Sequence, residues 1–250
     1  MQYKSLFPLL MDIDPQEIPI FIPTFNQPSL LELTLKQLSS RDETGRIVIY
    51  DNNSTYSPMI ELLESLSSKY DVVKSDINVG PRIFTEDLHI LELMPEYYIV
   101  TDPDLIYNPN LPKNYISEMK NVISNKNLAK VGFAIEIYDQ DERDRFSDPE
   151  RVQLWEESYW QSKIGMTSTK DPIYDAWIDT TFSLNKKSSC IYHHKFKKPT
   201  FRYPSARIAG AYTCQHVGWW KKEIIPQTSD EINYYLNNEL WSHTERYYYK

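Results

Sequence analysis

The stretch EYYIVTDPD, residues 96–104, contains a short apolar run that ends at two carboxylates one residue apart. Tyr, Ile and Val side chains pack well on a pleated surface, so the run is typical of a buried strand. Because Pro103 has no N–H for further pairing, the strand should end there and leave Asp102 and Asp104 at its carboxyl end, where open α/β sheets bind ligands. Two aspartates that converge repel each other unless a cation lies between them, and their oxygens suit Mg²⁺ or Mn²⁺. An isolated Asp-x-Asp triplet is also common in solvated loops, so the rest of the chain has to decide.

Two more apolar runs, residues 18–22 and 46–50, precede this stretch, and each is followed by a polar turn. Leucines at helical spacing predict a helix over about 29–39, which a capping-box pattern of Ser29 and Glu32 would open. The other elements expected in this half are a helix from Ser57, a short strand over 71–74 and a helix that ends near Met94.

Strands and helices therefore alternate in the first half, and the strands are continuous apolar runs. This pattern predicts an α/β fold with a mostly parallel central sheet that helices cover on both faces. Right-handed crossovers place the carboxyl ends of such strands at one edge. We therefore expect Thr24, Asp51, Asp102 and Asp104 to line a single crevice.

The second half has a different pattern. Residues 176–184 are mostly apolar or β-branched, so they predict a strand with Asp179 inside it. Thr228 and Glu231 form a capping-box pattern that predicts a last helix, with Ile232, Tyr235, Leu236 and Leu240 on one side. The other predicted elements are strands over 130–137 and 207–214 and a helix over about 149–161.

Composition limits the functions to consider. Of 250 residues, 41% are hydrophobic, and the net charge of −8 argues against a nucleic-acid partner. Two cysteines form no disulfide framework, and no signal peptide or run of roughly 18 apolar residues is present. We expect a cytoplasmic protein without a transmembrane segment. The tyrosine-rich end, residues 247–249, is a candidate for membrane-surface, lipid-linked acceptor or subunit contacts.

Several common catalytic sites are missing from the sequence. It has no Gly-x-Gly-x-x-Gly after the first strand, no P-loop and no Gly-x-Ser-x-Gly. Zinc is disfavoured, because the Cys190, His193, Cys214 and His216 spacing does not match a zinc finger. A carboxylate pair without a glycine-rich phosphate loop suits a nucleoside diphosphate that is bound through a metal ion.

Four motifs in order resemble the landmarks of GT-A glycosyltransferases, and family-2-like enzymes in particular. They are IPTFN (22–26), YDNNST (50–55), NVGPR (78–82) and TDPD (101–104). The match covers residues 18–105 and extends more loosely to His216. The resemblance implies a single GT-A domain over 1–250, with a small acceptor-side sheet. Its parts would be a nucleotide-sugar half (18–104), an acceptor half (105–220) and a helical tail (221–250).

The resemblance also implies site residues. Thr24 and Asn26 would meet the nucleotide, and Asp51 would bind its base or ribose. Asp102 would contact the ribose or the metal shell, Asp104 would bind Mn²⁺ or Mg²⁺ directly, and His216 would complete the coordination. The usual family pattern has Asp-Gly where this chain has Asn52-Asn53, which leaves the base, uracil by default, open. The implied reaction transfers a sugar from a UDP-sugar to a hydroxyl of a glycan, glycoprotein or lipid-linked sugar.

Catalysis needs charge neutralisation and a base. Arg82 and Arg207 are candidates to bind the diphosphate, because guanidinium groups suit phosphate oxygens. A surface position or a salt bridge is an equally good interpretation of each arginine. Asp179 is our candidate base for an inverting displacement, ahead of Glu156 and Glu157, because a carboxylate among apolar residues is costly to bury without a role. A retaining mechanism stays open.

Two other functions fit some of these features. A sugar-nucleotide nucleotidyltransferase would share the sheet, the metal and the acidic residues, but it would normally carry a glycine-rich loop, and this chain has only six glycines. A binding module with the same fold and no activity is the non-enzymatic alternative.

Overall fold

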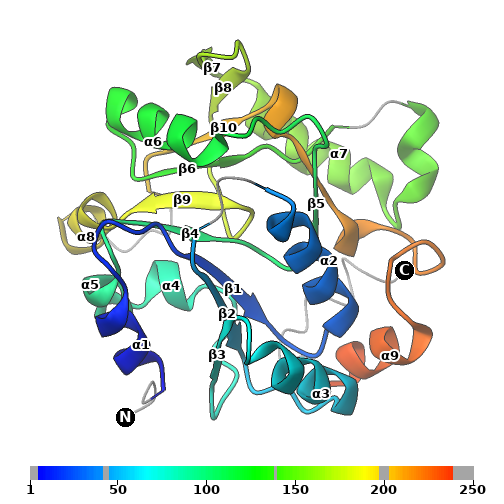
Figure 1. The fold of residues 1–250 in the computed structure, drawn as a ribbon. Coiled ribbons are helices and arrows are strands. Elements are labelled where there is room, and N and C mark those ends of the chain that lie inside the picture. Colours follow the sequence, from blue (N-terminus) through cyan, green and yellow to red (C-terminus); the bar gives the residue numbers. More distant parts are fainter. Residues whose placement is uncertain (1–4, 42–44, 138–139, 197–202, 239–250) are drawn as a thin grey trace.

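The computed structural model describes residues 5–41, 45–137, 140–196 and 203–238. A nine-stranded sheet runs through it (Figure 1). Its strands are β1 (Ile20–Thr24), β2 (Ile47–Asp51), β3 (Asp71–Lys74), β4 (Tyr97–Val100), β6 (Lys130–Phe133), β7 (Lys163–Met166), β8 (Pro172–Asp175), β9 (Ser183–Lys186) and β10 (Ser205–Ile208). Their order in the sheet is β3-β2-β1-β4-β9-β6-β10-β8-β7. One sheet thus contains strands from both halves of the chain.

The strands of the first half are parallel, so their carboxyl ends lie at one edge. β1 pairs with β2 on one side and with β4 on the other, and Thr24 lies opposite Asp51 in the register. β9 is antiparallel to both β4 and β6 and joins the two halves of the sheet. The loops that follow β1 and β2 are joined by hydrogen bonds from the Thr55 and Tyr56 N–H groups to Asn26 Oδ1.

Helices cover both faces of the sheet (Figure 1). Ile20 and Ile22 of β1 belong to one hydrophobic cluster, whereas Phe21 belongs to the opposite one, as the alternation of side chains along a strand requires. The first cluster includes residues of α2 (Pro28–Ser39), α3 (Ser57–Leu66) and α6 (Tyr115–Lys126). The second includes residues of α1 (Leu6–Asp12), α4 (Ile83–Glu86), α5 (Leu88–Leu93) and α8 (Lys187–Phe196).

A second, two-stranded sheet lies beside the carboxyl edge of the large one. It pairs β5 (Leu105–Tyr107) with β11 (Cys214–His216) in antiparallel register. The remaining helices are α7 (Pro149–Glu157), α9 (Ser229–Asn238) and the short 3-10 segments η1 (Gln140–Arg145), η2 (Ser158–Trp160), η3 (Gly210–Tyr212) and η4 (Val217–Trp219). No helix among the described residues is long and apolar enough to cross a membrane.

The predicted α/β class, with helices on both faces and a smaller second sheet, is confirmed. The strands predicted over 18–22, 46–50 and 71–74 correspond to β1, β2 and β3 within two residues, and the helix over 29–39 corresponds to α2.

Several details of the prediction were wrong. Residues 176–182 are a loop, and the strand β9 starts only at Ser183, so Asp179 is not inside a strand. The stretch 207–214 is not continuous, because Gly210, with φ +65°, turns the chain between β10 and η3. The helix that ends near Met94 is two short helices, α4 and α5, and no local pattern predicted α1, α6, α8, β5, β7 or β8.

The two predicted capping boxes had different outcomes. At α2 the box is absent, because Gln27 occupies the N-cap and the Ser29 hydroxyl donates to Glu231 Oε2 at 2.6 Å. At α9 the Glu231 N–H donates to Thr228 Oγ1 at 3.2 Å, so this half of the box forms. Leu240 and the tyrosines at 247–249 lie outside the described residues.

Candidate active site

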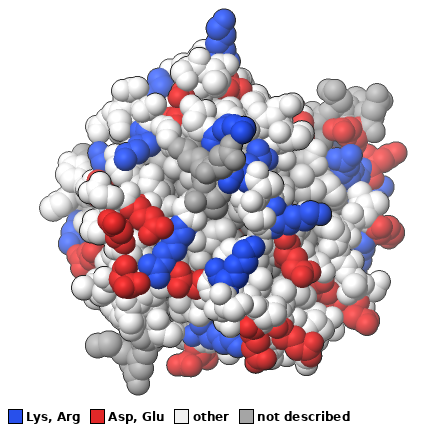
Figure 2. Space-filling model, viewed as in Figure 1, with Lys and Arg blue, Asp and Glu red and all other residues white. Residues whose placement is uncertain are grey.

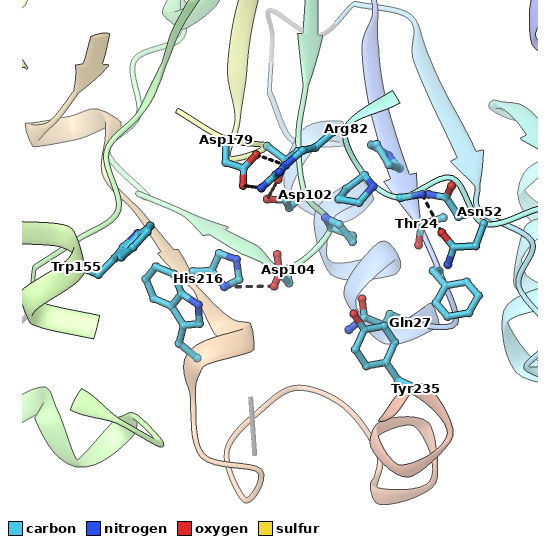
Figure 3. Close-up of a pocket in the computed structure, with 18 of the residues that line it drawn as sticks. Thr24, Gln27, Asn52, Arg82, Asp102, Asp104, Trp155, Asp179, His216 and Tyr235 are labelled. Atoms are coloured by element: carbon cyan, nitrogen blue, oxygen red, sulfur yellow. Dashed lines mark hydrogen bonds and ion pairs between the residues drawn. The ribbon is translucent and has the colours of Figure 1, made fainter. Parts of the chain in front are cut away.

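A pocket of about 600 Å³ opens at the carboxyl edge of β1, β2 and β4. Figure 3 shows its three parts: polar side chains of the β1 and β2 loops, an acidic group in the middle, and tryptophans at the other end. The first part includes Thr24, Gln27 and Asn52, and the last includes Trp155 on α7.

Asp102, Asp104 and His216 form the centre of the pocket. Each offers one ligand atom, and the three atoms lie within 4.8 Å of one another; this is the one such group among the described residues. His216 Nδ1 lies 3.3 Å from Asp104 Oδ2. Two carboxylate oxygens and an imidazole nitrogen form a donor set that fits Mn²⁺ or Mg²⁺, so the residues present fit the expected metal.

The pairing of β5 with β11 explains how residues so distant in sequence meet. His216 lies opposite Leu105 in the register, so it is placed next to Asp104. The Val217 N–H donates to Asp104 O at 2.9 Å and extends this pairing. The His216 ring stacks on Trp219 with centroids 4.6 Å apart and an interplanar angle of 14°, which fixes the orientation of the imidazole.

Burial shifts the pKa values of Asp102 and His216 in this cluster. The pKa of Asp102 is raised to about 7 by burial and by the neighbouring Asp104 carboxylate. Burial lowers the pKa of His216, which keeps the imidazole neutral and able to ligate near pH 7. The Thr180 hydroxyl donates to Asp102 Oδ2 at 2.9 Å and orients that carboxylate. A bound cation would favour the charged form of Asp102.

The loops after β1 and β2 are tied together by Asn26. Its Oδ1 accepts from the N–H groups of Thr55 and Tyr56 at 2.8 and 2.9 Å, and its own N–H donates to Ser54 Oγ. Asn26 has φ +52°, a left-handed conformation that Asn adopts more readily than most residues. Asn26 is fully buried, so it shapes the pocket wall from behind, whereas Thr24 lines the pocket itself.

Asp51 is buried at the end of β2. Both of its carboxylate oxygens accept from the Ser54 N–H, at 3.1 and 3.3 Å, and burial raises its pKa. The structure places its neighbour Asn52, not Asp51, in the pocket lining, with Asn52 Oδ1 accepting from the Val79 N–H at 3.3 Å. Asn53 has φ +63°, so Asn occupies a left-handed position where the family pattern usually has Gly.

Arg82 and Asp179 meet at the rim of the acidic cluster. Arg82 Nε and Nη2 donate to the two carboxylate oxygens of Asp179 at 2.8 and 2.6 Å, a bidentate pair (Figure 3). Burial alone would lower the pKa of Arg82, but the hydrogen bond to Asp179 and the negative charges of Asp179, Glu86 and Asp102 together raise it. Both residues line the pocket and are partly exposed.

Arg207 lies elsewhere. Its Nη1 donates to Glu156 Oε2 at 2.7 Å, both side chains are buried, and the guanidinium stacks over Tyr159 at 4.1 Å. The structure therefore does not bring Arg207 or Glu156 to the pocket lining, and Glu157 accepts instead from Gln153 Nε2 at 2.6 Å. Of the candidate bases, Asp179 alone lines the pocket.

Sequence reasoning missed several lining residues, and they are Gln27, Asn52, Trp177, Thr180 and Tyr235. The sequence could have indicated Asn52 as a lining residue, since it follows Asp51 in the YDNNST motif. Thr180 had no signal, because its contact with Asp102 depends on the path of a loop 78 residues away. Cys190 and Cys214 are buried thiols in different hydrophobic clusters, which removes the zinc alternative.

No model of a known protein family matches the sequence, and no curated protein matches it. The structure is similar to that of mannosyltransferase PcManGT from Pyrobaculum calidifontis, solved with GDP-Man and Mn²⁺. The TM-score is 0.51 at 12% identity, over 84% of this chain and 62% of that one. GalNAc-T7 with UDP, GalNAc and Mn²⁺ aligns with a TM-score of 0.49 at 12% identity, over 94% and 50% of the two chains. S. aureus TarS aligns with a TM-score of 0.36 at 19% identity, over 48% and 36%.

The chain thus spans less than two thirds of the length of PcManGT. At such low identity this similarity establishes the fold and nothing about substrates. Together with the nine-stranded sheet, the second sheet and the acidic triad, it shows that this chain has a GT-A fold.

Proposed function

We propose that this protein is a metal-dependent glycosyltransferase that transfers a sugar from a nucleotide sugar to an acceptor hydroxyl. One observation carries the proposal: Asp102, Asp104 and His216 converge within 4.8 Å in the centre of a pocket of about 600 Å³. That pocket lies at the carboxyl edge of a parallel sheet, where α/β folds bind their ligands.

The donor would occupy the end of the pocket near β1 and β2. Thr24, Gln27 and Asn52 offer polar groups there, and the Phe25 and Tyr235 rings, 6.3 Å apart, offer apolar surface for a base. The resemblance implies uracil, and PcManGT was solved with GDP-Man. Asn52 presents an amide where the family pattern has a carboxylate, so UDP- and GDP-sugars are the donors to compare first.

The diphosphate would lie at the acidic triad. A divalent cation held by Asp102, Asp104 and His216 would neutralise the charge that develops on the leaving group. Arg82 is close enough to this cluster to be influenced by the Asp102 charge, and its guanidinium keeps N–H groups beyond the two that bind Asp179. We assign Arg82 to the phosphate oxygens.

Asp179 is our candidate base. In an inverting displacement the acceptor oxygen attacks the anomeric carbon, the bond to the diphosphate breaks, and the acceptor proton moves to a carboxylate. Asp179 lines the pocket, and Figure 3 shows it next to Arg82 and close to Asp102 of the triad. A carboxylate has about four lone-pair sites, so the two bonds from Arg82 leave it able to accept a proton.

The acceptor would bind at the tryptophan end. Trp155, Trp177 and Trp219 line the pocket, and Trp155 is 54% exposed. Aromatic faces pair apolar area with a polar rim and suit the faces of sugar rings. Asp148 and Arg151 add groups that can bond to hydroxyls. We therefore propose a glycan or a sugar-bearing molecule as the acceptor.

The proposal is tested by incubating the protein with UDP- and GDP-sugars and Mn²⁺ and measuring the release of nucleoside diphosphate. Release that depends on Mn²⁺, is abolished by a chelator and is lost in Asp104→Asn supports the proposal. Pyrophosphate release from a nucleoside triphosphate and a sugar 1-phosphate would instead identify a nucleotidyltransferase. Binding of the diphosphate and Mn²⁺ with no turnover of any donor would favour a binding module. The anomeric configuration of the product, measured by proton NMR, separates inversion from retention.

A further inference from the structure

Three successive backbone carbonyls in the loop before β9 accept hydrogen bonds from two buried cationic side chains. Arg207 Nε donates to Trp177 O at 2.8 Å. Lys130 Nζ donates to Ile178 O at 3.1 Å and to Asp179 O at 2.8 Å. Both cations are only 3% exposed. Buried charges are rare unless they are paired or hydrogen-bonded, so these contacts are a specific feature of the loop.

The two cations come from separate strands of the sheet. Lys130 begins β6, and Arg207 lies on the neighbouring strand β10, where Glu156 balances its charge at 2.7 Å. Burial lowers the pKa of Lys130, and the charges of Asp179 and Glu86 oppose that effect. Hydrogen bonds from a charged donor are shorter and stronger than those between neutral groups. The loop is therefore attached to two strands of the central sheet.

The side chains of the same segment face the pocket. Trp177, Asp179 and Thr180 all line it. Asp179 accepts both bonds from Arg82, and the Thr180 hydroxyl donates to the metal-site carboxylate of Asp102. The backbone carbonyls of this segment thus accept hydrogen bonds from the central sheet, while its side chains line the candidate active site.

Gly132 permits this close approach. It lies on β6, two residues after Lys130, and a Cβ atom there would lie only 2.6 Å from Phe182 O and 3.0 Å from Ile178 Cδ1. No larger residue fits without a shift of the loop. Gly132 therefore lets the segment from Ile178 to Phe182 lie directly on the sheet.

We propose that Lys130 and Arg207 are positioning residues that hold residues 177–180 in place before any substrate binds. Neither cation touches the pocket, so each acts through the loop. The predicted effect of these two residues on turnover rests on the proposed function, whereas their predicted effect on the loop does not. Catalytic groups work best when surrounding residues hold them in the productive geometry.

The test is Lys130→Met, which keeps the length of the side chain and removes its donors. In the metal-free protein, hydrogen exchange of the peptide covering 176–182 should rise about tenfold or more, while β1 and β2 stay unchanged. Mn²⁺ affinity should fall about tenfold, because Thr180 no longer orients Asp102. Turnover should fall together with the Mn²⁺ affinity. Lys130→Arg should restore much of the exchange protection, the Mn²⁺ affinity and the turnover.

Lys126→Met is the matched control. Lys126 also donates to a backbone carbonyl, Ile164 O at 2.8 Å, but that carbonyl belongs to β7 at the far edge of the sheet. This variant should leave the exchange of 176–182 and the Mn²⁺ affinity unchanged. Gly132→Ala is a second way to displace the loop, because its Cβ pushes the loop outward with both cations intact. It should raise the exchange of 176–182 and lower Mn²⁺ affinity and turnover, as in Lys130→Met.

Unchanged exchange in 176–182 in a folded Lys130→Met protein overturns the proposal. If Lys130→Met does not fold, the same result in Gly132→Ala overturns it. If hydrogen exchange of 176–182 rises in Lys130→Met and the wild-type protein turns over no nucleotide sugar, this inference stands and the proposed function is removed.

Discussion

In the proposed metal site, Asp104 is the buried carboxylate that lies 3.3 Å from His216 Nδ1. We predict that Asp104→Asn weakens Mn²⁺ binding by at least about tenfold, since the neutral amide removes a charged ligand from a three-ligand set. Isothermal titration with Mn²⁺ measures the effect. Asp148→Asn is the control, because Asp148 lines the same pocket outside the triad. Equal affinities in Asp104→Asn and the wild type would remove Asp104 from the metal site.

We predict that Asp102 makes Mn²⁺ binding depend on pH. Because its pKa is raised to about 7, the metal-free carboxyl is largely protonated below that pH, and a cation has to displace the proton. Mn²⁺ affinity should therefore be steady above pH 7 and fall by about tenfold per pH unit below it. Titrations between pH 5.5 and 8.5 check this, and a flat profile would show that Asp102 does not ligate in competition with a proton.

If Asp179 is the base, its variant should separate donor binding from turnover. Asp179→Asn keeps the shape of the side chain but removes the base, so turnover should fall by roughly a hundredfold or more while donor affinity stays nearly the same. Steady-state kinetics with the active donor, and a separate titration of the nucleoside diphosphate, measure the two quantities. A variant with ordinary turnover would assign the base role to another group.

At the residue scale, the sequence motifs predicted the acidic centre of the site. Which other side chains enter the pocket depends on contacts between distant parts of the chain. Asp102 and Asp104 were identified because a strand and a proline mark their position. Residue type alone indicates Arg207, and its buried partner Glu156 lies 51 residues away in sequence, beyond any local pattern. Asp51 was chosen by analogy, but its carboxylate accepts from Ser54 and its neighbour Asn52 enters the pocket.

At the scale of elements, Glu231 links α9 to the start of α2. It is 1% exposed and accepts from the Ser29 N–H and hydroxyl and from Gln227 Nε2. Glu231→Ala leaves these donors without that acceptor and should lower the free energy of unfolding by roughly 1–3 kcal/mol. Urea unfolding measures the change. Glu61→Ala, at an exposed position of α3, should stay within about 0.5 kcal/mol of the wild type, and equal effects would contradict the role of Glu231.

Local sequence patterns predicted the helices and strands whose own residues show a clear hydrophobic periodicity. β1, β2 and α2 have continuous apolar runs or leucines at helical spacing, and these were found within two residues. The strand expected over 176–184 was wrong, because β-branched residues resemble a strand even where the backbone carbonyls bind Lys130 and Arg207. The β5–β11 pairing joins segments about a hundred residues apart, so no local pattern predicts that His216 meets Asp104.

At the scale of the whole molecule, charge and topology agree with the proposed donor. On the face viewed in Figure 2, acidic and basic side chains of the described residues are interspersed, and the chain carries a net charge of −8. An acidic protein that binds a diphosphate has to bring cations to it, which the triad and Arg82 would do. The alternation of strands and helices was enough to predict this architecture, whereas the insertion of antiparallel β9 between β4 and β6 was not predictable from local patterns.

The central claim is that one divalent cation is bound by Asp102, Asp104 and His216 beside a diphosphate. Crystals grown with Mn²⁺ and the nucleoside diphosphate of the active donor, measured for manganese anomalous scattering, test it most directly. We predict one strong peak within ligand distance, about 2.0–2.3 Å, of an oxygen of Asp104 and a nitrogen of His216. A nucleotide bound in the pocket with no peak at the triad, or a peak elsewhere, would contradict it.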